Sequence, residues 1–563
     1  MSKTRNKKRD LFSLGLAIAF LLMLNYVGSF VFHRFDLTSE KRYTLSDATK
    51  ELLKNLDDVV FVKVYLEGDF PAGFKRLRNE TKEMLDEFRA YSDNNIEYEF
   101  INPSDNPDKK QQNEFYKQLY EKGLQPTNLE VKDDNGTSQK IIFPAAIVTY
   151  KTNEIPWQLL KTQMGRSPEA QLNNSIQSLE YEFASCIRNL SVLTRPQIGF
   201  IEGHDEWDTT YVQDIADEVS EFYSVKRLAI NEQLKALDNM SAIIIAKPDS
   251  SFSDKDKFII DQFIMKGGKV LWLIDPMYTS PDSLRLNGGT LSVPYALRLD
   301  DMLFKYGVRI NQDLIADVQS SVIPVNVAMR GQQADIQMKP WVFSPLILST
   351  SNHPIVKNLD VIKMDFVSSM DTVQSKGITK TILLQSSKYS KAILSPVRVD
   401  LRLVNMPIEE KRFNNPYRNV AVLLEGKFES VFKNHLNPMI AKDSAIGFKP
   451  DGVESKMIVI SDGDVIRNDI DYRSQKKLPL GYDKYTNQTY GNKNFILNCV
   501  NYLCDDSGLI GVRARELTLR LLDKKKLKND RLKWQMINSG VPLLLLVLFG
   551  IIYNIRRKRK YSS

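Results

Sequence analysis

Two long apolar segments lie near the ends of the chain, at residues 11–32 and 535–553, and the sequence between them mixes apolar and polar positions as globular proteins do. Each segment is close to the ~20 apolar residues that a helix needs to cross a bilayer. Neither contains Asp, Glu, Lys or Arg. The pattern therefore predicts a large body that is anchored in one membrane by a transmembrane helix at each end.

The first apolar segment could instead be a cleaved signal peptide, because a cluster of basic residues precedes it. A signal peptide has a shorter apolar core, which is followed by a cleavage site made of small residues. Here the segment ends in the bulky residues Phe30, Val31 and Phe32. We therefore expect an uncleaved anchor.

Strand and helix patterns alternate over residues 33–195. Runs of β-branched and aromatic residues predict strands, and an apolar stripe through Leu77, Met84, Leu85 and Phe88 predicts a helix. The order β-α-β-α-β-β-α predicts a thioredoxin-like fold, but the chain lacks the C-x-x-C of a redox enzyme, so we interpret this unit as a binding or spacer domain. The expected elements are a short helix that begins after an N-cap at Ser46, strands at 58–68 and 96–103, a helix between them, a helix near 113–122, a hairpin of β-rich stretches at 129–132 and 140–151 with its turn at 134–136, and a helix over 168–190.

A cleaner alternation of strands and helices follows Arg195-Pro196. The continuous apolar runs 242–246 and 270–274 are typical of parallel strands that are buried on both faces. With the helices between them they predict a doubly wound, flavodoxin-like α/β domain. The expected strands are 197–203, 224–230, 241–248, 269–276 and 457–464, the expected helices are 209–223, one that begins at Ser253, and 492–504, and the less regular stretch 279–450 has candidate strands at 381–385 and 420–424.

These patterns divide the chain into a body and its membrane segments. The expected parts are a basic tail (1–10), a transmembrane helix (11–32), a thioredoxin-like domain (33–195), an α/β domain (196–511), a basic connecting helix (512–534), a second transmembrane helix (535–553) and a second basic tail (554–563).

The net charge of +8 is concentrated at the ends of the chain. Residues 1–10 carry +4 and residues 512–563 carry +11, so residues 11–511 sum to −7. Basic flanks suit the anionic headgroups of membrane lipid, whereas a nucleic-acid partner would require a basic face on the folded body. We therefore expect contact with lipid and no nucleic-acid partner.

The three cysteines, Cys186, Cys499 and Cys504, do not form a disulfide framework or a zinc-binding spacing. We expect them to be small buried residues.

The basic residues at both termini predict that both termini are cytoplasmic. A cationic run of similar size, at 520–533, lies on the other side of the second span and favours the opposite orientation. The first helix usually dominates orientation, and long loops cross the membrane largely regardless of charge. We therefore expect a two-pass protein of the inner (cytoplasmic) membrane with most of its chain on the periplasmic side.

An acidic loop follows the first strand of the α/β domain, at the edge where such folds bind ligands. It could bind a metal or another ligand, or it could be a solvated turn in which Asp208 caps the next helix. A second acidic stretch lacks the spacing and the Glu of an EF-hand, so we interpret it as a turn. We predict no metal-binding, cofactor-binding or catalytic residues. The residues considered are Glu202, His204, Asp205, Glu206 and Asp208 in the first loop, and Asp462, Asp464, Asn468 and Asp469 in the second.

Hydrolysis on such a fold would need a Cys nucleophile on a tight strand-to-helix turn, with a His that activates it. The corresponding turn reads Lys247-Pro248-Asp249, and no cysteine follows a predicted strand. The stretch Gly267-Gly268-Lys269 lacks the first glycine of a phosphate-binding loop. We therefore expect that the chain is not an enzyme and that any ATP hydrolysis occurs on another chain.

Several segments together resemble one family. They are FDLTSEKRYTLSDATKELLKNL directly after the first apolar segment, FIEGHDE, KGGKVLWLIDP, VISDGDVIRND and NKNFILNCVNYLCDDSGLIGVRARELTLRLLDKKKL. Their order and spacing resemble the GldG family, membrane-anchored auxiliary subunits of ABC transporters associated with gliding motility. The resemblance covers essentially the whole chain. It implies a partner permease, a separate cytoplasmic ATPase and an amidotransferase-like central domain.

The expected function is therefore that of a non-catalytic, substrate-binding-like auxiliary subunit, whose external body couples a permease to substrate or to envelope partners. Two alternatives remain open: an envelope module that binds carbohydrate or peptide independently of any transporter, and a cryptic hydrolase. The membrane spans could pack on the permease through small residues such as Gly15 and Gly540, or they could serve only as anchors.

Overall fold

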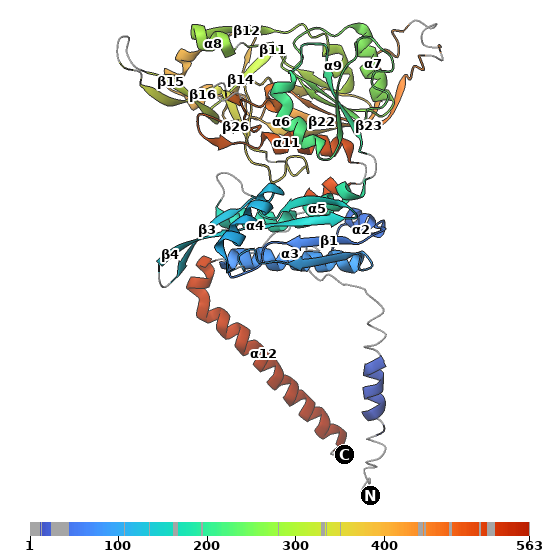
Figure 1. Ribbon diagram of the computed structural model, residues 1–563, viewed down its shortest axis with the longest axis vertical. Coiled ribbons are helices and arrows are strands. Elements are labelled where there is room, and N and C mark those ends of the chain that lie inside the picture. The colour runs from blue at the N-terminus through green and yellow to red at the C-terminus, as the bar shows by residue number, and fades with distance from the viewer. Residues whose placement is uncertain are drawn as a thin grey trace. The chain divides into compact units, whose positions relative to one another are not determined.

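The computed structural model separates into two compact units, a body and a C-terminal helix (Figure 1). The body contains two lobes, each built on its own sheet: a small lobe (residues 44–192 and 508–514) and a large lobe (residues 195–505). The structure describes residues 12, 14–23, 44–105, 107–133, 136–161, 167–192, 195–279, 281–327, 333, 335–349, 351–436, 443, 446–471, 476–505, 508–514 and 524–561.

The small lobe has a four-stranded sheet in the order β2-β1-β5-β6. Strand β1 is parallel to β2 and antiparallel to β5, and β5 is antiparallel to β6. Val60, Val62 and Val64 alternate along β1 and are fully buried, because successive strand residues point to opposite faces. The elements are α2 (Asp47–Lys54), β1 (Val60–Val64), α3 (Ala72–Tyr91), β2 (Ile96–Phe100), α4 (Lys109–Glu121), β3 (Thr127–Asp133), β4 (Gly136–Ile142), β5 (Ala145–Tyr150), β6 (Asn153–Gln158) and α5 (Pro168–Ser191).

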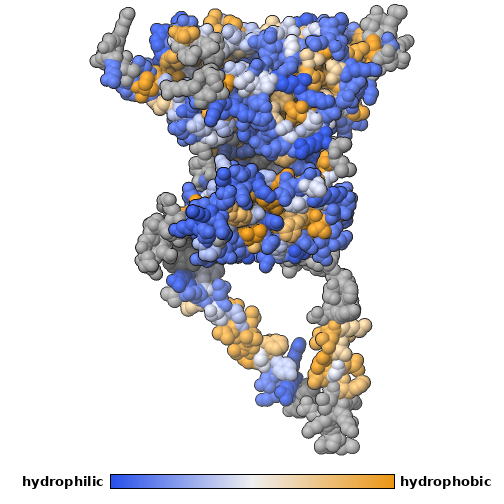
Figure 2. All heavy atoms as spheres, viewed as in Figure 1, coloured by the Kyte–Doolittle hydropathy of each residue, from blue (hydrophilic) through white to orange (hydrophobic). Residues whose placement is uncertain are grey.

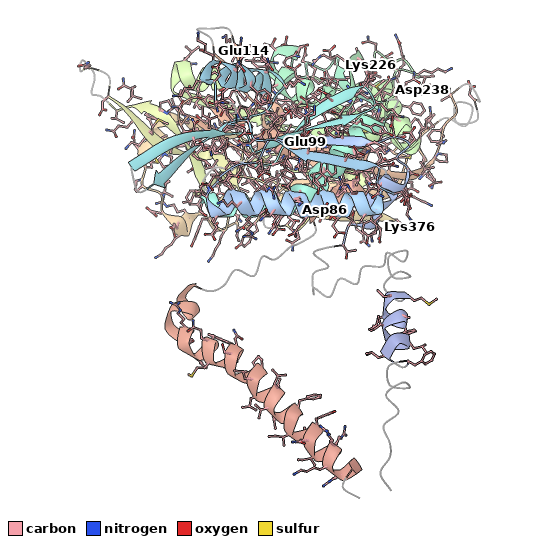
Figure 3. The ribbon with its side chains drawn as sticks, turned by 60° about the horizontal axis from the view of Figure 1, so that its bottom comes forward. Asp86, Glu99, Glu114, Lys226, Asp238 and Lys376 are labelled. Carbon is pink, nitrogen blue, oxygen red and sulfur yellow. The ribbon has the colours of Figure 1, made fainter. Side chains whose placement is uncertain are left out.

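Helix α3 is amphipathic in the predicted way. Leu77, Leu85 and Phe88 are buried in the core of the small lobe. Asp86 lies on the exposed side of the helix (Figure 3). It accepts a hydrogen bond of 2.6 Å from the hydroxyl of Tyr98 in β2. The apolar stripe read from the sequence is therefore the buried face of this helix.

The strands that follow α4 in the small lobe differ from the prediction. Strands β3 and β4 form a separate two-stranded hairpin, and the predicted stretch 140–151 is divided between β4 and β5. Strand β6 was not predicted, because it contains Pro156. Proline cannot donate to a strand ladder, but an edge strand such as β6 tolerates it. The predicted turn residues 134 and 135 lie outside the described residues.

The first and the last elements of the body both pack on α5. Ser46 caps α2 as predicted, and its Oγ accepts a hydrogen bond of 3.1 Å from the amide of Thr49. Glu180 of α5 accepts a hydrogen bond from the Ser46 amide at 2.6 Å and another from the Thr49 hydroxyl at 2.9 Å. At the other end of the body, the 3-10 helix η4 (Leu509–Ala514) contacts both α5 and α2.

Segment η4 was expected to close the α/β domain and to begin the basic helix at 512. In the structure the chain instead returns to the small lobe, where Leu509 and Val512 are buried in the core. The predicted helix over 512–534 is therefore wrong at its start, because two apolar side chains draw this segment into the core as a short 3-10 turn. Residues 515–523 lie outside the described part.

The large lobe has a sheet in the order β13-β18-β22-β23-β10-β9-β7-β8, with β19 also paired to β22. Strands β8, β7, β9, β10 and β23 run parallel, and β22 is antiparallel to β23. The predicted strands of the α/β domain correspond to the five parallel strands. The elements of this part are β7 (Gln197–Glu202), α6 (Thr209–Ser220), β8 (Ser224–Ala229), β9 (Ala242–Ala246), α7 (Asp254–Met265), β10 (Lys269–Leu273), β23 (Asp451–Ile460) and α11 (Asn492–Cys504).

Both faces of the parallel sheet are covered by helices. Ile244 of β9 packs in the cluster that contains α6 and α11, whereas its neighbours Ile243 and Ile245 pack in the cluster that contains α7 and α9. This alternation explains the continuous apolar run of β9. Cys186, Cys499 and Cys504 are buried and free of disulfides, as predicted.

The stretch between β10 and β23 adds antiparallel structure to the large lobe. It contains the small sheets β11-β12-β21, β14-β20 and β15-β16-β17. The predicted strands 381–385 and 420–424 lie within β19 and β22. The elements are β11 (Met277–Tyr278), α8 (Pro281–Asn287), β12 (Gly289–Pro294), α9 (Asp300–Tyr306), β13 (Val308–Ile310), β14 (Asp313–Asp317), β15 (Ser320–Asn326), β16 (Ile336–Ile347), β17 (Ile362–Lys363), β18 (Met370–Thr372), β19 (Ile378–Gln385), β20 (Ser390–Leu394), β21 (Val397–Asp400), the 3-10 helices η1 (Leu401–Asn405) and η2 (Glu410–Arg412), and β22 (Asn419–Glu429). After β23 come the 3-10 helix η3 (Asp464–Ile466) and the short strands β24 (Ile470–Asp471), β25 (Lys476–Lys477), β26 (Tyr482–Asp483) and β27 (Gln488–Thr489).

The C-terminal unit is one long helix, α12 (Lys524–Tyr561), which contains Pro542 and has a non-helical backbone at Asp530. Its middle is apolar and its end is charged (Figure 2). The segment Lys533–Arg559 is 27 residues long and is apolar enough to cross a membrane, which agrees with the predicted second span. Of the predicted first span, Leu14–Met23 form a short apolar helix, and most of the remaining residues lie outside the described part.

Candidate functional site at the carboxyl edge of the large sheet

The direction of the chain through the parallel sheet reverses between β7 and β9. From β7 the chain moves outward to β8, and from β9 it moves the other way through β10 to β23. In open α/β sheets, ligands bind at such a reversal, outside the carboxyl ends of the strands. The loops after β7, β9, β10 and β23 all end at this edge, which makes it the first place to look for a functional site.

Lys247 occupies the end of β9, at the position where a catalytic turn would place its nucleophile. Its backbone has φ of +54°, in the left-handed region that a non-glycine residue rarely adopts. Its ammonium group lies 2.9 Å from a carboxylate oxygen of Asp275, which follows β10, and 2.6 Å from one of Asp464, which follows β23. One largely buried cation thus links the ends of three parallel strands, and we call Lys247, Asp275 and Asp464 the Lys247 cluster.

Backbone amides hold the carboxylates around Lys247 in place. The second oxygen of Asp275 accepts a hydrogen bond of 2.6 Å from the amide of Gly463. Asp462 accepts hydrogen bonds from the amides of Asp464 at 2.7 Å and Asp365 at 2.9 Å. Asp462 is completely buried, and Asp275 is nearly so. The acidic turn after β23 is therefore a rigid structural element of the edge.

Burial and charge determine the protonation of this cluster. Burial works against a charged lysine, but Asp275 and Asp464 outweigh it and raise the pKa of Lys247 above its ordinary value. Burial raises the pKa of Asp275 from 3.8 to about 6, against the attraction of Lys247. Burial, together with the neighbouring carboxylates, raises the pKa of Asp462 as well. Lys247 therefore stays protonated at neutral pH and cannot act as a nucleophile or a general base.

Aromatic rings and a guanidinium group cover the Lys247 ammonium. The Lys247 ammonium lies 5.0 Å from the centre of the Trp207 ring, within the range of a cation–π interaction. The indole N–H of Trp207 donates a hydrogen bond of 3.1 Å to the carbonyl of Gly463. The guanidinium of Arg467 lies over the same indole ring, at 4.8 Å, and over Tyr211, at 5.0 Å. The edge is therefore packed closed around Lys247.

The structure gives each residue of the predicted acidic loop its own partner. Glu202 forms an ion pair with Arg227, and Asp205 accepts a hydrogen bond from Ser250. Asp208 caps α6 as predicted, accepting a hydrogen bond of 2.7 Å from the amide of Thr210. The side chains are thus distributed among separate structural roles, which favours the interpretation of this loop as a turn.

His204 is buried within the large lobe. Its two ring nitrogens lie 3.3 Å from Glu206 and 3.3 Å from Asp256, and its ring stacks on Phe252 with centres 3.7 Å apart. Burial disfavours the charged form, but the two carboxylates outweigh it and raise the pKa of His204 above its ordinary value. The ring is held on both sides, so its role is to tie the loop to α7.

The residues of the second acidic stretch also serve the fold. Asn468 donates to the carbonyl of Thr210 at 3.1 Å, and Asp469 pairs with Lys484 at 3.4 Å. Within the described part of the chain, no group of three or more His, Cys, Asp or Glu residues is arranged to hold a metal ion. The absence of metal-binding, cofactor-binding and catalytic residues in the chain as a whole stays a prediction.

The sequence analysis did not predict the residues at the centre of this edge. It considered Lys247 only as a position without a nucleophile, and it did not single out Asp275, Trp207 or Arg467. One signal was available: Asp275, Asp462 and Asp464 each follow a strongly apolar strand, and the carboxyl ends of parallel strands meet at one edge. The pairing with Lys247 could have been inferred from that rule.

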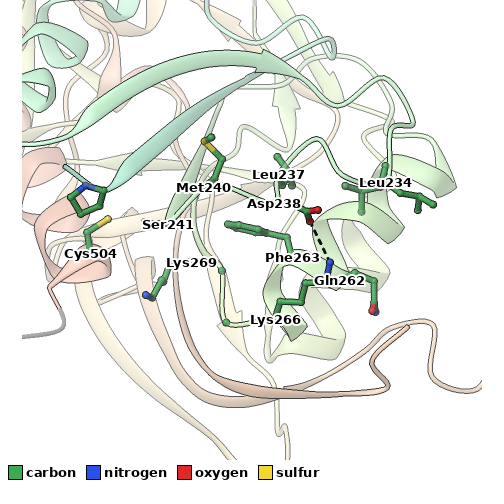
Figure 4. Close-up of a pocket in the computed structure, with 14 residues that line it drawn as sticks. Leu234, Leu237, Asp238, Met240, Ser241, Gln262, Phe263, Lys266, Lys269 and Cys504 are labelled. Carbon is green, nitrogen blue, oxygen red and sulfur yellow. Dashed lines mark hydrogen bonds and ion pairs between the residues drawn. The ribbon is translucent and has the colours of Figure 1, made fainter. Parts of the chain in front are cut away.

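A cavity lies at the opposite edge of the same sheet (Figure 4). It has a volume of about 260 Å³ and is lined by Ser241 and Lys269 at the beginnings of β9 and β10, together with Met240 and Phe263. An ion pair of 3.4 Å between Asp238 and Lys266 lies beside it. The cavity is slightly smaller than usual ligand sites, and it has no residue in common with the Lys247 cluster.

Comparison with known proteins places the chain in a family. Residues 39–149 match a domain family of unknown function. An uncharacterized protein of Borreliella burgdorferi is 19% identical over 582 aligned positions, which cover 99% of each chain. A solved structure of the mmIFT52 N-terminal domain is 12% identical, with 55% of this chain and 96% of that one covered, and its TM-score of 0.31 is too low to inform the fold. Residues 195–499, more than half of the chain, match the family described as an ABC-type uncharacterized transport system, and the chain therefore belongs to this family of auxiliary ABC transport proteins.

Proposed function

We propose that the protein is a non-catalytic, membrane-anchored auxiliary subunit of an ABC transporter, whose body couples the permease to substrate or envelope partners. The observation that carries the proposal is the family match over residues 195–499. On this proposal, a permease and a separate ATPase are the partners. Membership of the GldG family, and with it a role in gliding motility, is the finer form of the proposal and rests on the sequence resemblance.

The closed edge of the large sheet supports a non-catalytic role. Lys247 stands where the turn after β9 would need a nucleophile, and its ammonium is held by Asp275 and Asp464. The nearby His204 is held by Glu206 and Asp256 and stacked on Phe252, so it is not directed toward a reacting group. Covalent hydrolysis requires a nucleophile with an adjacent base, and the contacts of Lys247 and His204 support the proposal that neither residue takes these roles.

The fold proposal is supported by the order and direction of the strands. The order β2-β1-β5-β6, with a parallel pair next to an antiparallel pair, suits a thioredoxin-like small lobe. The parallel strands between two helical layers suit a flavodoxin-like or amidotransferase-like large lobe. We propose the domain division 33–195 and 196–511 on this basis, with η4 packing back on the first domain.

The membrane proposal is a two-pass protein with cytoplasmic termini and a periplasmic body. It is supported by the exposed apolar segment Lys533–Arg559, by the apolar helix Leu14–Met23, and by the basic residues at both termini. The three native cysteines are buried, so they give little background in a labelling experiment. A D134C variant should react with an impermeant thiol reagent in cells whose outer membrane has been permeabilised. Labelling only after lysis would contradict this orientation.

Co-purification tests the functional proposal. The full-length chain, isolated in mild detergent from the membranes of its own host, should retain a permease and an ATPase. A matched variant, in which residues 11–32 and 535–553 are replaced by unrelated apolar helices, should stay in the membrane but lose both partners. Absence of both partners from the wild-type complex would contradict the transporter proposal. Retention of both partners by the variant would show that the body, rather than the spans, makes the contact.

A further inference from the structure

A second polar site lies in the large lobe, away from the Lys247 cluster. It is a cavity of about 650 Å³, within the range of small-molecule sites. Four chain segments meet there: the link between β13 and β14, the residue before β18, the end of β20, and the residues that precede β22. We call it the Arg418 pocket, after the cation that lines it from the last of these segments.

One side of the Arg418 pocket is already saturated with hydrogen bonds. The two carboxylate oxygens of Asp313 accept bonds from the amide of Ser369 at 2.7 Å and from its hydroxyl at 2.6 Å. The side-chain amide of Asn311 donates to the hydroxyl of Ser369 and to Asp371, both at 3.0 Å. Burial raises the pKa of Asp313, against these bonds and the nearby charge of Arg418. This wall is a fixed support with little capacity left for a ligand.

The other side of the pocket presents polar side chains without partners. The Nε atom of Arg418 is buried and has no hydrogen-bond partner among the described residues. The backbone of Arg418 is fixed, because its amide donates to the Ser386 hydroxyl at 2.8 Å and its carbonyl accepts from the Ser386 amide at 2.8 Å. The backbone that carries Arg418, just before β22, is therefore fixed, while its guanidinium forms no hydrogen bond with a described residue.

Neutral polar groups line the same pocket as this cation. Gln312, Ser395 and Asn415 line the pocket, and their side chains form no hydrogen bond within the described part of the chain. The backbone of Asn415 is held by Ser390, whose carbonyl accepts the Asn415 amide proton at 2.9 Å. Among these groups the Arg418 Nε is the buried donor without a partner, and such a donor is costly, so this side of the pocket is suited to an acceptor-rich ligand.

We propose that the Arg418 pocket binds a small polar anion through a carboxylate or phosphate group, with the neighbouring amides and hydroxyl binding the rest of the ligand. A guanidinium group matches two oxygens of such a group with parallel N–H donors. The volume suits a molecule of about the size of a sugar acid or a sugar phosphate. This site does not depend on the proposed transporter role, so it can be tested on the chain alone.

The test compares three ligands of the same size on the purified full-length chain in detergent. D-glucose, D-glucuronate and D-glucose 6-phosphate differ in carrying no anionic group, a carboxylate or a phosphate. We expect at least one of the two anions to bind at least about tenfold more tightly than glucose in isothermal titration calorimetry, which is the scale of charge-assisted hydrogen bonds. A preference between the two anions identifies the group. Equal binding of all three ligands, or no binding of any, overturns the proposal.

Two variants locate the site. R418Q removes the charge and should weaken anion binding at least about tenfold, and N415D places a negative charge on the same side and should also weaken it. N415D keeps the test valid if R418Q fails to fold. The matched control is R298Q, which changes an exposed arginine paired with Asp254 outside the pocket and should bind as the wild type does. Unchanged anion binding in N415D and in folded R418Q overturns the proposal.

Discussion

The Lys247 cluster and the Arg418 pocket each place a cation among polar side chains, but only Lys247 forms ion pairs with described residues. In the first, the ammonium of Lys247 pairs with Asp275 and Asp464, and the indole ring of Trp207 covers it. In the second, the guanidinium of Arg418 has no ion pair with a described residue, its Nε is buried without a partner, and the residue lines an open pocket of about 650 Å³. The Lys247 cluster lies at the carboxyl ends of the parallel strands, where α/β folds usually bind ligands, and the Arg418 pocket does not. The comparison teaches that a cation among polar side chains can be fully paired within the chain, as Lys247 is, or can be left without an ion pair to any described residue, as Arg418 is.

The largest expected effect is the loss of the Lys247 charge. Lys247→Met leaves the buried Asp275 and the largely buried Asp464 without their cation, and breaking a buried ion pair in this way costs about 3–5 kcal/mol of unfolding free energy. Urea denaturation of the full-length chain measures it. The control is Lys477→Met, which removes an exposed pair with Asp217 and should cost less than about 1 kcal/mol. A loss below about 1 kcal/mol for Lys247→Met would show that the cluster is not structural.

The pH dependence of the same cluster gives the next effect. Asp275 has its pKa raised from 3.8 to about 6 in the folded state, so the folded chain holds a proton that the unfolded chain releases between these values. Stability should therefore fall as pH rises through that window, by up to about 3 kcal/mol. Asp275→Asn keeps the acceptor for the Gly463 amide and should abolish this part of the pH profile. An identical profile in the variant would assign the proton to another group.

His204 should give the same pH trend in a higher pH range. Its folded-state pKa is raised by Glu206 and Asp256, despite burial. The stability it contributes is fully present below about pH 6.5, the unfolded value, and is lost as pH rises through the raised folded value. His204→Gln should therefore destabilise the chain more at pH 6 than at pH 9, as measured by thermal denaturation. Equal losses at the two pH values would show that only packing against Phe252 matters.

The smallest expected effect is at Arg418. Its guanidinium has no hydrogen bond or ion pair with a described residue, so Arg418→Gln should change the unfolding free energy by less than about 0.5 kcal/mol. Thermal denaturation without ligand checks this. A loss of unfolding free energy near that of Lys247→Met would mean that Arg418 stabilises the fold. The two sites would then not differ in the way described above.

Local patterns identified the parallel strands and the helix starts. The run Ala242–Ala246 is apolar because both faces of β9 are covered, and Ser46, Asp208 and Ser253 cap the helices that follow them. Neither polar site could be found in this way. Lys247 and Asp464 are 217 residues apart, and the Arg418 pocket forms from four separate segments. Their chemistry depends on long-range pairing, which periodicity does not encode.

The shared contact of α2 and η4 with α5 has a mechanical consequence. The chain enters the body at α2 and leaves it after η4, and both elements pack on one helix of the small lobe. Tension applied between the two ends of the body therefore passes through the small lobe alone. The large lobe, inserted between α5 and η4, lies outside this path and is joined to the small lobe by its two chain connections and by the ion pair of 3.0 Å between Arg188 and Asp505.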